Sequence, residues 1–219
     1  MPRPRSLTDA ALAAAALAVV DRDGLQALSM RTVASELGMG TMSIYRYVTD
    51  REQLERLVVD LVLGAVDLEV SSRPPWRRRV TILVERVREA VSAHPAIVPL
   101  LLVHRHRSRT SLRWAEAILA ALQEAGFGAP QRVIALRSLI SYVIGALQTE
   151  YLGALSGAGT AAIAELPAAE YPLLSETARH ARQVPADEEF RRGLEIVLDG
   201  LEQLRQREPR TRAREGPAR

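Results

Sequence analysis

The chain has 219 residues, of which 47% are hydrophobic and only 4% aromatic, so its core must be built mainly from Ala, Leu, Val and Ile. Ala, Leu, Arg and Glu dominate, which favours an all-α fold. Cysteine is absent, which excludes a disulfide framework, a thiol nucleophile and a Cys-ligated metal. The net charge is +3 without any Lys, so an affinity for nucleic acid would depend on how the charges are arranged.

The N-terminal residues predict an amphipathic helix over 7–23. Arg3 and Arg5 precede an apolar run over 10–20, in the order of a signal peptide. The run is short, Asp residues bracket it, and its larger side chains share one helical face, which favours a helix of the mature protein. Charges also interrupt the apolar stretch 54–70, so we expect a cytoplasmic protein without a membrane span. Arg3 and Arg5 could extend a DNA contact or lie in a terminus without a role.

Residues 28–54, LSMRTVASELGMGTMSIYRYVTDREQL, predict a helix-turn-helix followed by a capped third helix. Ser29 can cap the first helix by accepting a backbone N–H, and Gly38 permits the sharp turn. Asp50 and Gln53 have the spacing of a capping box for the third helix. The three expected helices cover residues 30–37, 41–47 and 51–70.

The second of these helices has an unusual outward face. It carries Thr41, Met42, Ser43, Tyr45, Arg46 and Tyr47, and no acid. Such a helix can enter the major groove without repelling phosphate. Arg46 could read guanine edges, Met42 could meet a thymine methyl, and the two Tyr hydroxyls could donate to phosphates. The residue types alone also allow an ordinary helical hairpin with a polar surface.

The segment resembles the signature of the TetR family of transcriptional regulators, and residues 7–60 match it throughout. The resemblance implies DNA contacts by Ser29, Arg31, Thr41, Met42, Ser43, Tyr45, Arg46, Tyr47 and Arg51. The base-reading positions would be Thr41, Met42, Ser43 and Arg46, whereas Tyr45 matches a phosphate-binding Tyr. Gly40 replaces a usual Ser cap, and Tyr47 with Val48 replaces a His-Phe pair. These departures leave the operator sequence open.

Proline and glycine divide the remainder of the chain into further helices. We expect them over residues 75–93, 96–105, 109–125, 130–152, 168–183 and 186–207. Gly153–Ala164 is rich in Gly, Ala and Ser and predicts a mobile loop. The expected domains are a DNA-binding domain over 1–52, a ligand-binding and dimerisation domain over 53–207, and a disordered tail over 208–219.

Two of these helices, 130–152 and 186–207, are long and amphipathic. Each carries an apolar stripe at helical spacing, which suits packing of the pair on each other or on the same helices of a second subunit. The resemblance to the TetR family implies the second arrangement, a homodimer joined by a four-helix bundle. A dimer would read a palindromic operator whose half-sites lie about one helical turn apart.

The middle helices are expected to hold a small-molecule effector. The candidate liners are His94, His104, Trp114, Tyr142, Gln148 and Glu150, each of which could equally be an ordinary core or helix-end residue. Residues 74–152 are similar to the C-terminal domain of the tetracycline-repressor branch. In that repressor a His and a Glu help hold magnesium and drug, but Thr149 stands at the second position by spacing. We therefore expect neither magnesium nor tetracycline, and no other metal or cofactor.

Enzyme signatures are absent from the sequence. His104 and His106 would point to different faces of a helix, and there is no phosphate loop, nucleophile elbow or pair of carboxylates in an apolar setting. The sequence predicts an all-α transcriptional regulator, a repressor released from its operator by a small molecule. Two alternatives stay open, a helical dimeric scaffold that binds no specific DNA and an architectural DNA binder that ignores small molecules.

Overall fold

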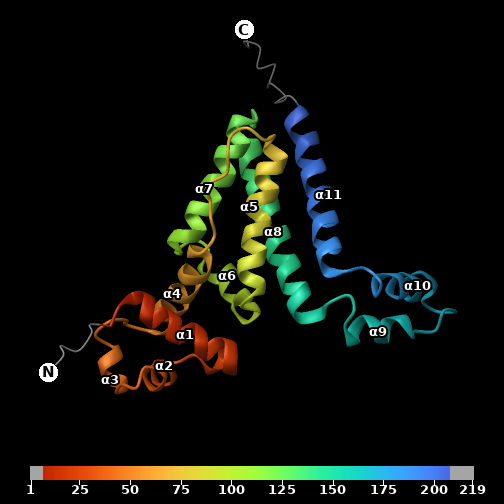
Figure 1. Cartoon of the computed structure of the whole chain (residues 1–219). Coiled ribbons are helices and arrows are strands. Elements are labelled where there is room, and N and C mark those ends of the chain that lie inside the picture. Colours follow the sequence, from red (N-terminus) through yellow and green to blue (C-terminus); the bar gives the residue numbers. More distant parts are fainter. Residues whose placement is uncertain (1–6, 208–219) are drawn as a thin grey trace, which may run out of the picture.

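The computed structural model describes residues 7–207, and every regular element in that range is helical (Figure 1). Arg3, Arg5 and the expected tail over 208–219 lie outside the described residues. In chain order the elements are α1 (Asp9–Asp23), η1 (Leu25–Ala27), α2 (Met30–Glu36), α3 (Thr41–Ile44), α4 (Arg51–Gly64), α5 (Trp76–Ser92), η2 (Pro95–Ile97), α6 (Val98–His104), α7 (Arg109–Glu124), α8 (Ala129–Gly153), α9 (Ala158–Ala164), α10 (Pro172–Ala181) and α11 (Ala186–Gln206).

Helices α1 to α3 form a small head around the start of α4 (Figure 1). Ser29 caps α2 as expected: its hydroxyl accepts the Thr32 N–H, and its own N–H donates to Thr32 Oγ1. Gly38 takes the positive φ of 64° that the turn requires. Val33 and Ile44 are fully buried against α1 and α4, so the turn places α3 at one edge of the molecule with a fixed face outward.

Helix α4 ends at Gly64, six residues before the predicted end. The chain then continues without regular secondary structure, with Val66, Leu68 and Val70 half-buried and the acids between them exposed. Arg86 of α5 donates to the backbone carbonyls of Asp67 and Glu69. The apolar residues make the sequence look like a continuation of the helix. However, they recur at every second position, which is the period of an extended chain and not that of a helix.

The C-terminal domain is a bundle in which α5, α7 and α8 lie together and α11 packs along α8 (Figure 1). Side chains from α5 and α8 hold α11 at both ends: Trp76 Nε1 donates to Glu202, and the Tyr142 hydroxyl donates to the Phe190 carbonyl at 2.5 Å. A Cβ on Gly193 would lie 2.5 Å from that hydroxyl. Gly193 therefore allows α11 to approach Tyr142 on α8 of the same chain closely.

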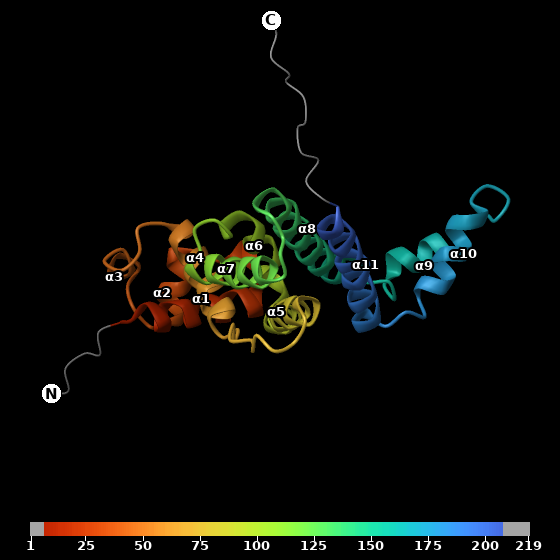
Figure 2. The ribbon, with the colours of Figure 1, turned by 90° about the horizontal axis from the view of Figure 1, so that it is seen from above.

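Helices α9 and α10 form an arm that extends beyond α11, on the side away from the head (Figures 1 and 2). The prediction of a loop over Gly153–Ala164 was wrong for its second half, where α9 forms. Gly157 begins the helix and Ala-rich sequence continues it, since Ala has the highest helix propensity. The arm packs mainly on itself and touches α8 only weakly, and Leu173 is 75% exposed.

Within 7–207 no helix is long and apolar enough to cross a membrane. The same residues contain no group of three or more His, Asp or Glu side chains placed to hold a metal ion.

Candidate DNA interface and ligand cavity

The short helix α3 divides its residues between the core and the solvent. Ile44 and the following Val48 are buried and fix the helix on the head. On the other side Met42 is 79% exposed and Tyr45 49%, and Arg46 also faces solvent. Thr41 and Ser43 are half-buried at the rim of this surface. The exposed face therefore presents a thioether, a phenol and a guanidinium together.

The regular part of this helix is shorter than the predicted 41–47. Beyond Ile44 the N–H groups of Arg46 and Tyr47 bond three residues back, to Ser43 and Ile44, so the chain tightens into 3-10 turns. Tyr47 is half-buried and packs on the core. Its side chain thus belongs as much to the head as to the exposed surface.

The remaining candidate DNA contacts lie at helix starts. The Ser29 hydroxyl is occupied as the α2 cap, and Arg31 is exposed beside it. Arg51, at the start of α4, donates to Glu55 at 2.8 Å and to the Leu25 carbonyl at 3.2 Å. The guanidinium therefore ties α4 to the connection between α1 and α2.

Side chains of Asp50 and Gln53 both accept backbone N–H groups at the start of α4. The Asp50 carboxylate accepts the Gln53 backbone N–H at 2.8 Å. The Gln53 side-chain oxygen accepts the backbone N–H of Thr49, whereas in a capping box it would accept that of Asp50. The bond from the Gln53 N–H, with one from the Thr49 hydroxyl, lowers the pKa of Asp50 below its usual value. Asp50 is the first acid after Glu36 in the sequence, so the α3 surface contains no negative charge of its own.

The C-terminal domain encloses an apolar cavity of about 260 Å3 between the end of α4 and helices α5 to α8. Its lining residues are Leu63, Val87, Leu101, Arg105, His106, Ser111, Leu112, Trp114, Ala115, Leu136, Ile140, Val143 and Ile144. The indole of Trp114 is fixed in the wall because its Nε1 donates to the Leu83 carbonyl at 3.0 Å. Arg105, His106 and Ser111 come from the stretch between the end of α6 and the first turn of α7, and none of the lining residues is an acid.

Of the six predicted ligand-binding residues, only Trp114 lines this cavity. His94 Nδ1 lies 2.8 Å from Asp21 and links α1 to the end of α5. His104 is fully buried, with Nε2 2.9 Å from Glu55 of α4. Gln148 is half-buried on α8 and borders none of the described pockets.

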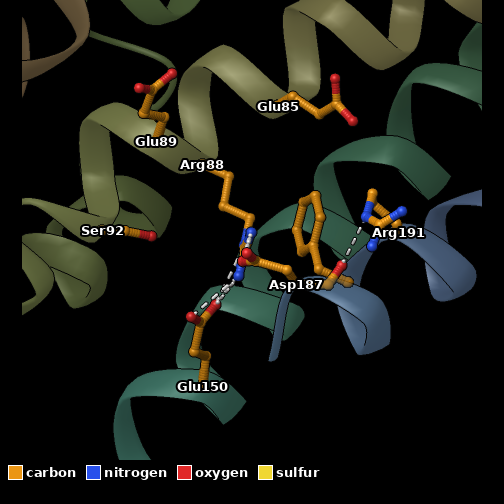
Figure 3. Close-up of a pocket in the computed structure, with 8 residues that line it drawn as sticks. Glu85, Arg88, Glu89, Ser92, Glu150, Asp187 and Arg191 are labelled. Atoms are coloured by element: carbon orange, nitrogen blue, oxygen red, sulfur yellow. Dashed lines mark hydrogen bonds and ion pairs between the residues drawn. The ribbon is translucent and has the colours of Figure 1, made fainter. Parts of the chain in front are cut away.

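Glu150 borders a different, charged basin between α5, α8 and α11 (Figure 3). Tyr142 borders a neighbouring pocket between α8 and α11, which Glu150 also lines. In the charged basin Arg88 reaches between Glu150, at 3.1 Å, and Asp187, at 2.7 Å. Its guanidinium also lies 4.7 Å from the centre of the Phe190 ring. These contacts join three helices and satisfy the Arg88 charge, so the basin is a structural junction.

The cavity was missed in the sequence because its walls are made of the same aliphatic residues as the core. Leu136, Ile140 and Ile144 belong to the apolar stripe that suggests helix pairing, and packing places them in the cavity wall. One signal was available. Arg105 and His106 stand in a basic segment without acids that directly follows the apolar helix α6.

The segment from His104 to Ser111 has two sides. Arg105, His106 and Ser111 border the cavity, whereas their neighbours hold α4. The α4 contacts are those of His104 with Glu55, of Arg107 with Glu52, and of Ser108 and Thr110 with Asp60. Asp60 alone accepts three hydrogen bonds, from Ser108 Oγ at 2.6 Å and from Thr110 N and Oγ1 at 3.2 and 2.8 Å. One stretch of chain thus contacts both the cavity and the helix that carries the head.

Comparison with known proteins matches both parts of the chain. Residues 12–56 match the family model "Bacterial regulatory proteins, tetR family", and residues 72–205 match "Tetracyclin repressor-like, C-terminal domain". A helix-turn-helix-type transcriptional regulator of Saccharopolyspora erythraea is 32% identical over 205 residues, which cover 89% of this chain and 84% of that protein. The transcriptional repressor DrrR1 of Streptomyces coeruleorubidus is 29% identical, with 93% and 80% covered.

A solved structure with the same arrangement is that of ActR, a TetR family protein of Streptomyces coelicolor, in complex with actinorhodin. It superposes with a TM-score of 0.78 at 26% sequence identity, over 92% of this chain and 99% of that one. The likeness extends over both the head and the helical bundle.

Proposed function

Since the chain belongs to the TetR family of DNA-binding transcriptional regulators, we propose that it is a homodimeric, cytoplasmic repressor that leaves a palindromic operator when a small molecule enters the apolar cavity. The observation that carries this proposal is the segment from His104 to Ser111, which borders the cavity on one side and holds α4 on the other.

The DNA-reading surface is the exposed face of α3 together with the starts of α2 and α4. Thr41, Met42, Ser43 and Arg46 read base edges in the major groove. Tyr45 donates to a phosphate, and Ser29, Arg31, Tyr47 and Arg51 contact the backbone. The exposure of Met42, Tyr45 and Arg46, and the absence of acids from Leu37 to Thr49, support this assignment.

The dimer forms through the outer faces of α8 and α11. A groove of about 370 Å3 lies between these helices, bordered by Ile134, Ser138, Ile196 and Gly200 among others. Ile196 is 73% exposed, and a Cβ on Gly200 would meet nothing within 4 Å in its own chain. A second copy related by a two-fold axis would cover this apolar surface and would leave room for close helix packing at Gly200. The arm of α9 and α10 extends the same side of the molecule.

The ligand site is the apolar cavity, with Trp114 as the one aromatic wall residue. ActR, whose chain superposes on this one, is known in complex with actinorhodin, which supports a small-molecule effector here. His94, His104, Tyr142 and Glu150 have bonding partners elsewhere in the chain, so they act as structural links rather than ligand contacts.

Release follows from the two-sided segment. A ligand that contacts Arg105, His106 or Ser111 favours the position of the segment that suits those contacts. Because neighbouring residues of the segment are hydrogen-bonded to α4, a shift of the segment also moves α4 and with it the head. In a dimer a small rotation of each head changes the separation of the two α3 helices, and both can no longer fit successive major grooves.

Selection of the purified protein against a randomised duplex pool tests this proposal. We expect enrichment of a two-fold palindrome that binds with a steep dependence on salt concentration. Enrichment of no sequence, with the protein folded and dimeric, would favour the helical scaffold instead. An enriched sequence that no apolar small molecule displaces would favour an architectural DNA binder.

A further inference from the structure

The polar residues of the ligand cavity are all at one place. Apolar side chains from α4, α5, α6, α7 and α8 form most of the wall. Arg105, His106 and Ser111 contribute the polar part, from the chain between the end of α6 and the first turn of α7. No carboxylate is among the lining residues. The cavity therefore has an apolar body and a single basic end.

The charge at this end is not neutralised by the described part of the chain. Neighbouring Arg107 pairs with Glu52, and half-buried Arg88 pairs with two carboxylates. Arg105 forms no ion pair with any described acid, and its only described side-chain hydrogen bond goes to the carbonyl of Leu102. A guanidinium has five N–H donors, so most of those on Arg105 remain available at the cavity mouth.

We propose that the effector is an apolar organic anion, with its hydrocarbon body among Trp114 and the aliphatic walls and its acidic group on Arg105. This inference rests on the ligand site proposed above and adds the chemical class of the ligand. The walls contribute affinity through burial of apolar surface, which does not discriminate among hydrophobic molecules of similar size. Discrimination comes from Arg105, which forms charge-assisted bonds with a carboxylate or sulfonate and repels a cation.

A matched pair of fluorescent probes tests the proposal. 1-Anilinonaphthalene-8-sulfonate and N-phenyl-1-naphthylamine share one apolar body, and only the first carries an acidic group. We expect Arg105→Met to weaken binding of the sulfonate by about tenfold and to leave the neutral probe unchanged. Tenfold is the lower end for a hydrogen bond to a charged group, because Arg105 is exposed to solvent. Equal losses for both probes, or none for either, would overturn the proposal.

Two control variants locate the effect. Arg73→Met removes the same charge from the exposed connection between α4 and α5, and should leave the affinities for both probes unchanged. Ala115→Trp places a large side chain in the cavity and should abolish binding of both probes, with retention of helicity checked by circular dichroism. If the sulfonate still binds the folded Ala115→Trp protein with unchanged affinity, it occupies another surface and the inference fails.

Competition experiments distinguish two shapes of apolar acid that could occupy the cavity. 2-Naphthoate is a flat aromatic acid, and decanoate is a flexible aliphatic one. Displacement of the sulfonate probe by either acid supports the inference and identifies the preferred shape. Displacement by neither would overturn it.

The release assay on the selected operator separates this inference from the proposed function. If the probes bind with the Arg105-dependent preference but leave the operator bound, the inference holds and ligand-controlled release fails. If both probes release the operator equally in the wild type and in Arg105→Met, release holds and the inference fails.

Discussion

At the scale of single residues, α3 shows how one short helix performs two tasks. Ile44 is fully buried and Val48 nearly so, which positions the helix. Tyr45 and Arg46, between them in sequence, are exposed. Substitutions on the two sides should therefore have different effects: those on the buried side should lower the stability of the head, and those on the exposed side should change the proposed contacts with DNA.

The two exposed residues should differ from each other as well. Arg46→Ala should relax base preference at one position of each half-site, at a cost of about 1–3 kcal/mol for the preferred base. Tyr45→Phe removes only a phosphate donor, so it should weaken binding to all sequences similarly. Fluorescence anisotropy with the selected operator and its single-base variants measures both effects. If Arg46→Ala left the base preference intact, α3 would not be the reading helix as assigned.

Glu202 provides a test of how α11 is fixed to the bundle. Its carboxylate accepts bonds from Arg205, Gln206 and Trp76, and the bond from Arg205 is the main reason why its pKa falls from 4.5 to about 2. A lowered pKa stabilises the folded state above pH 4.5, and this stabilisation is lost as the pH falls toward 2.

The variant Glu202→Gln should therefore be less stable than the wild type at pH 7. The difference in free energy of unfolding should shrink as the pH is lowered from 4.5 toward 3. Urea unfolding across this range measures it. A difference that stayed constant with pH would mean that the ionised Glu202 carboxylate, bonded mainly to Arg205, does not contribute to stability.

At the scale of elements, α4 is the part shared by the two domains. Its start is tied to the head through Arg51 and the Leu25 carbonyl, and its middle is gripped by Ser108 and Thr110 through Asp60. The expected boundary between residues 52 and 53 would fall within the first turn of this helix. We propose that α4 transmits motion because it belongs rigidly to both parts.

Asp60→Asn tests the hydrogen bonds from Ser108 and Thr110 with a side chain of the same shape. The amide keeps one acceptor and brings two donors toward groups that donate, so the free energy of unfolding should fall by about 1–2 kcal/mol. Operator affinity should fall roughly three- to tenfold, since the heads then populate orientations that do not fit the operator. Urea unfolding and anisotropy measure the two effects. Asp67→Asn is the matched control, because Asp67 lies after α4, where its carboxylate pairs with Arg86 and accepts the Glu69 N–H. Equal operator affinities for Asp60→Asn and wild type would contradict the role of this contact.

Most elements could be predicted from the sequence because local signals mark their ends. Ser29, Gly38, the prolines just before α5 and α11, and the proline in the first turn of α8 determine backbone conformation by themselves. Two errors have the same origin. Gly and Ala around 153–164 suggest a loop and yet allow α9, and the residues after Gly64 resemble a helix but alternate as extended chain. In both cases contacts with other segments decide between weak local preferences.

The two parts of the candidate site differ in how far the sequence reveals them. The α3 surface lies within one short segment, so residue types and the resemblance to the TetR family were enough to name its candidate residues. The cavity is assembled from five helices, and membership depends on packing that no local pattern records. The polar residues His104 and Glu150 lie outside this cavity and bond to other residues of the chain, and this pairing too depends on packing.

At the scale of the whole molecule, the proposed dimer explains the surfaces that the chain leaves uncovered. The outer faces of α8 and α11 and the arm of α9 and α10 carry exposed apolar residues, among them Ile134, Leu173 and Ile196. A two-fold dimer would bury these faces and would fix the separation of the heads at the opposite end of the molecule (Figure 2).

Ile196→Glu should separate the subunits. The two-fold axis would bring two added carboxylates into one apolar interface, and burial of unpaired charge is costly. We expect a shift from dimer to monomer in sedimentation velocity at micromolar concentration, with the helical content unchanged. Val103→Glu, a similar change at an exposed residue of α6, should stay dimeric. A dimeric Ile196→Glu protein would place the interface elsewhere.

The distance between the two heads of the dimer is the most direct test of how the segment from His104 to Ser111 controls the heads. The chain has no Cys, so Ser35→Cys on exposed α2 accepts one spin label per subunit. Double electron–electron resonance should give a single narrow distance in the operator complex and in the free protein. With Asp60→Asn added, the free protein should give a broader distribution that the operator narrows again. Identical distributions with and without Asp60→Asn would contradict the claim that the segment from His104 to Ser111 controls the heads through α4.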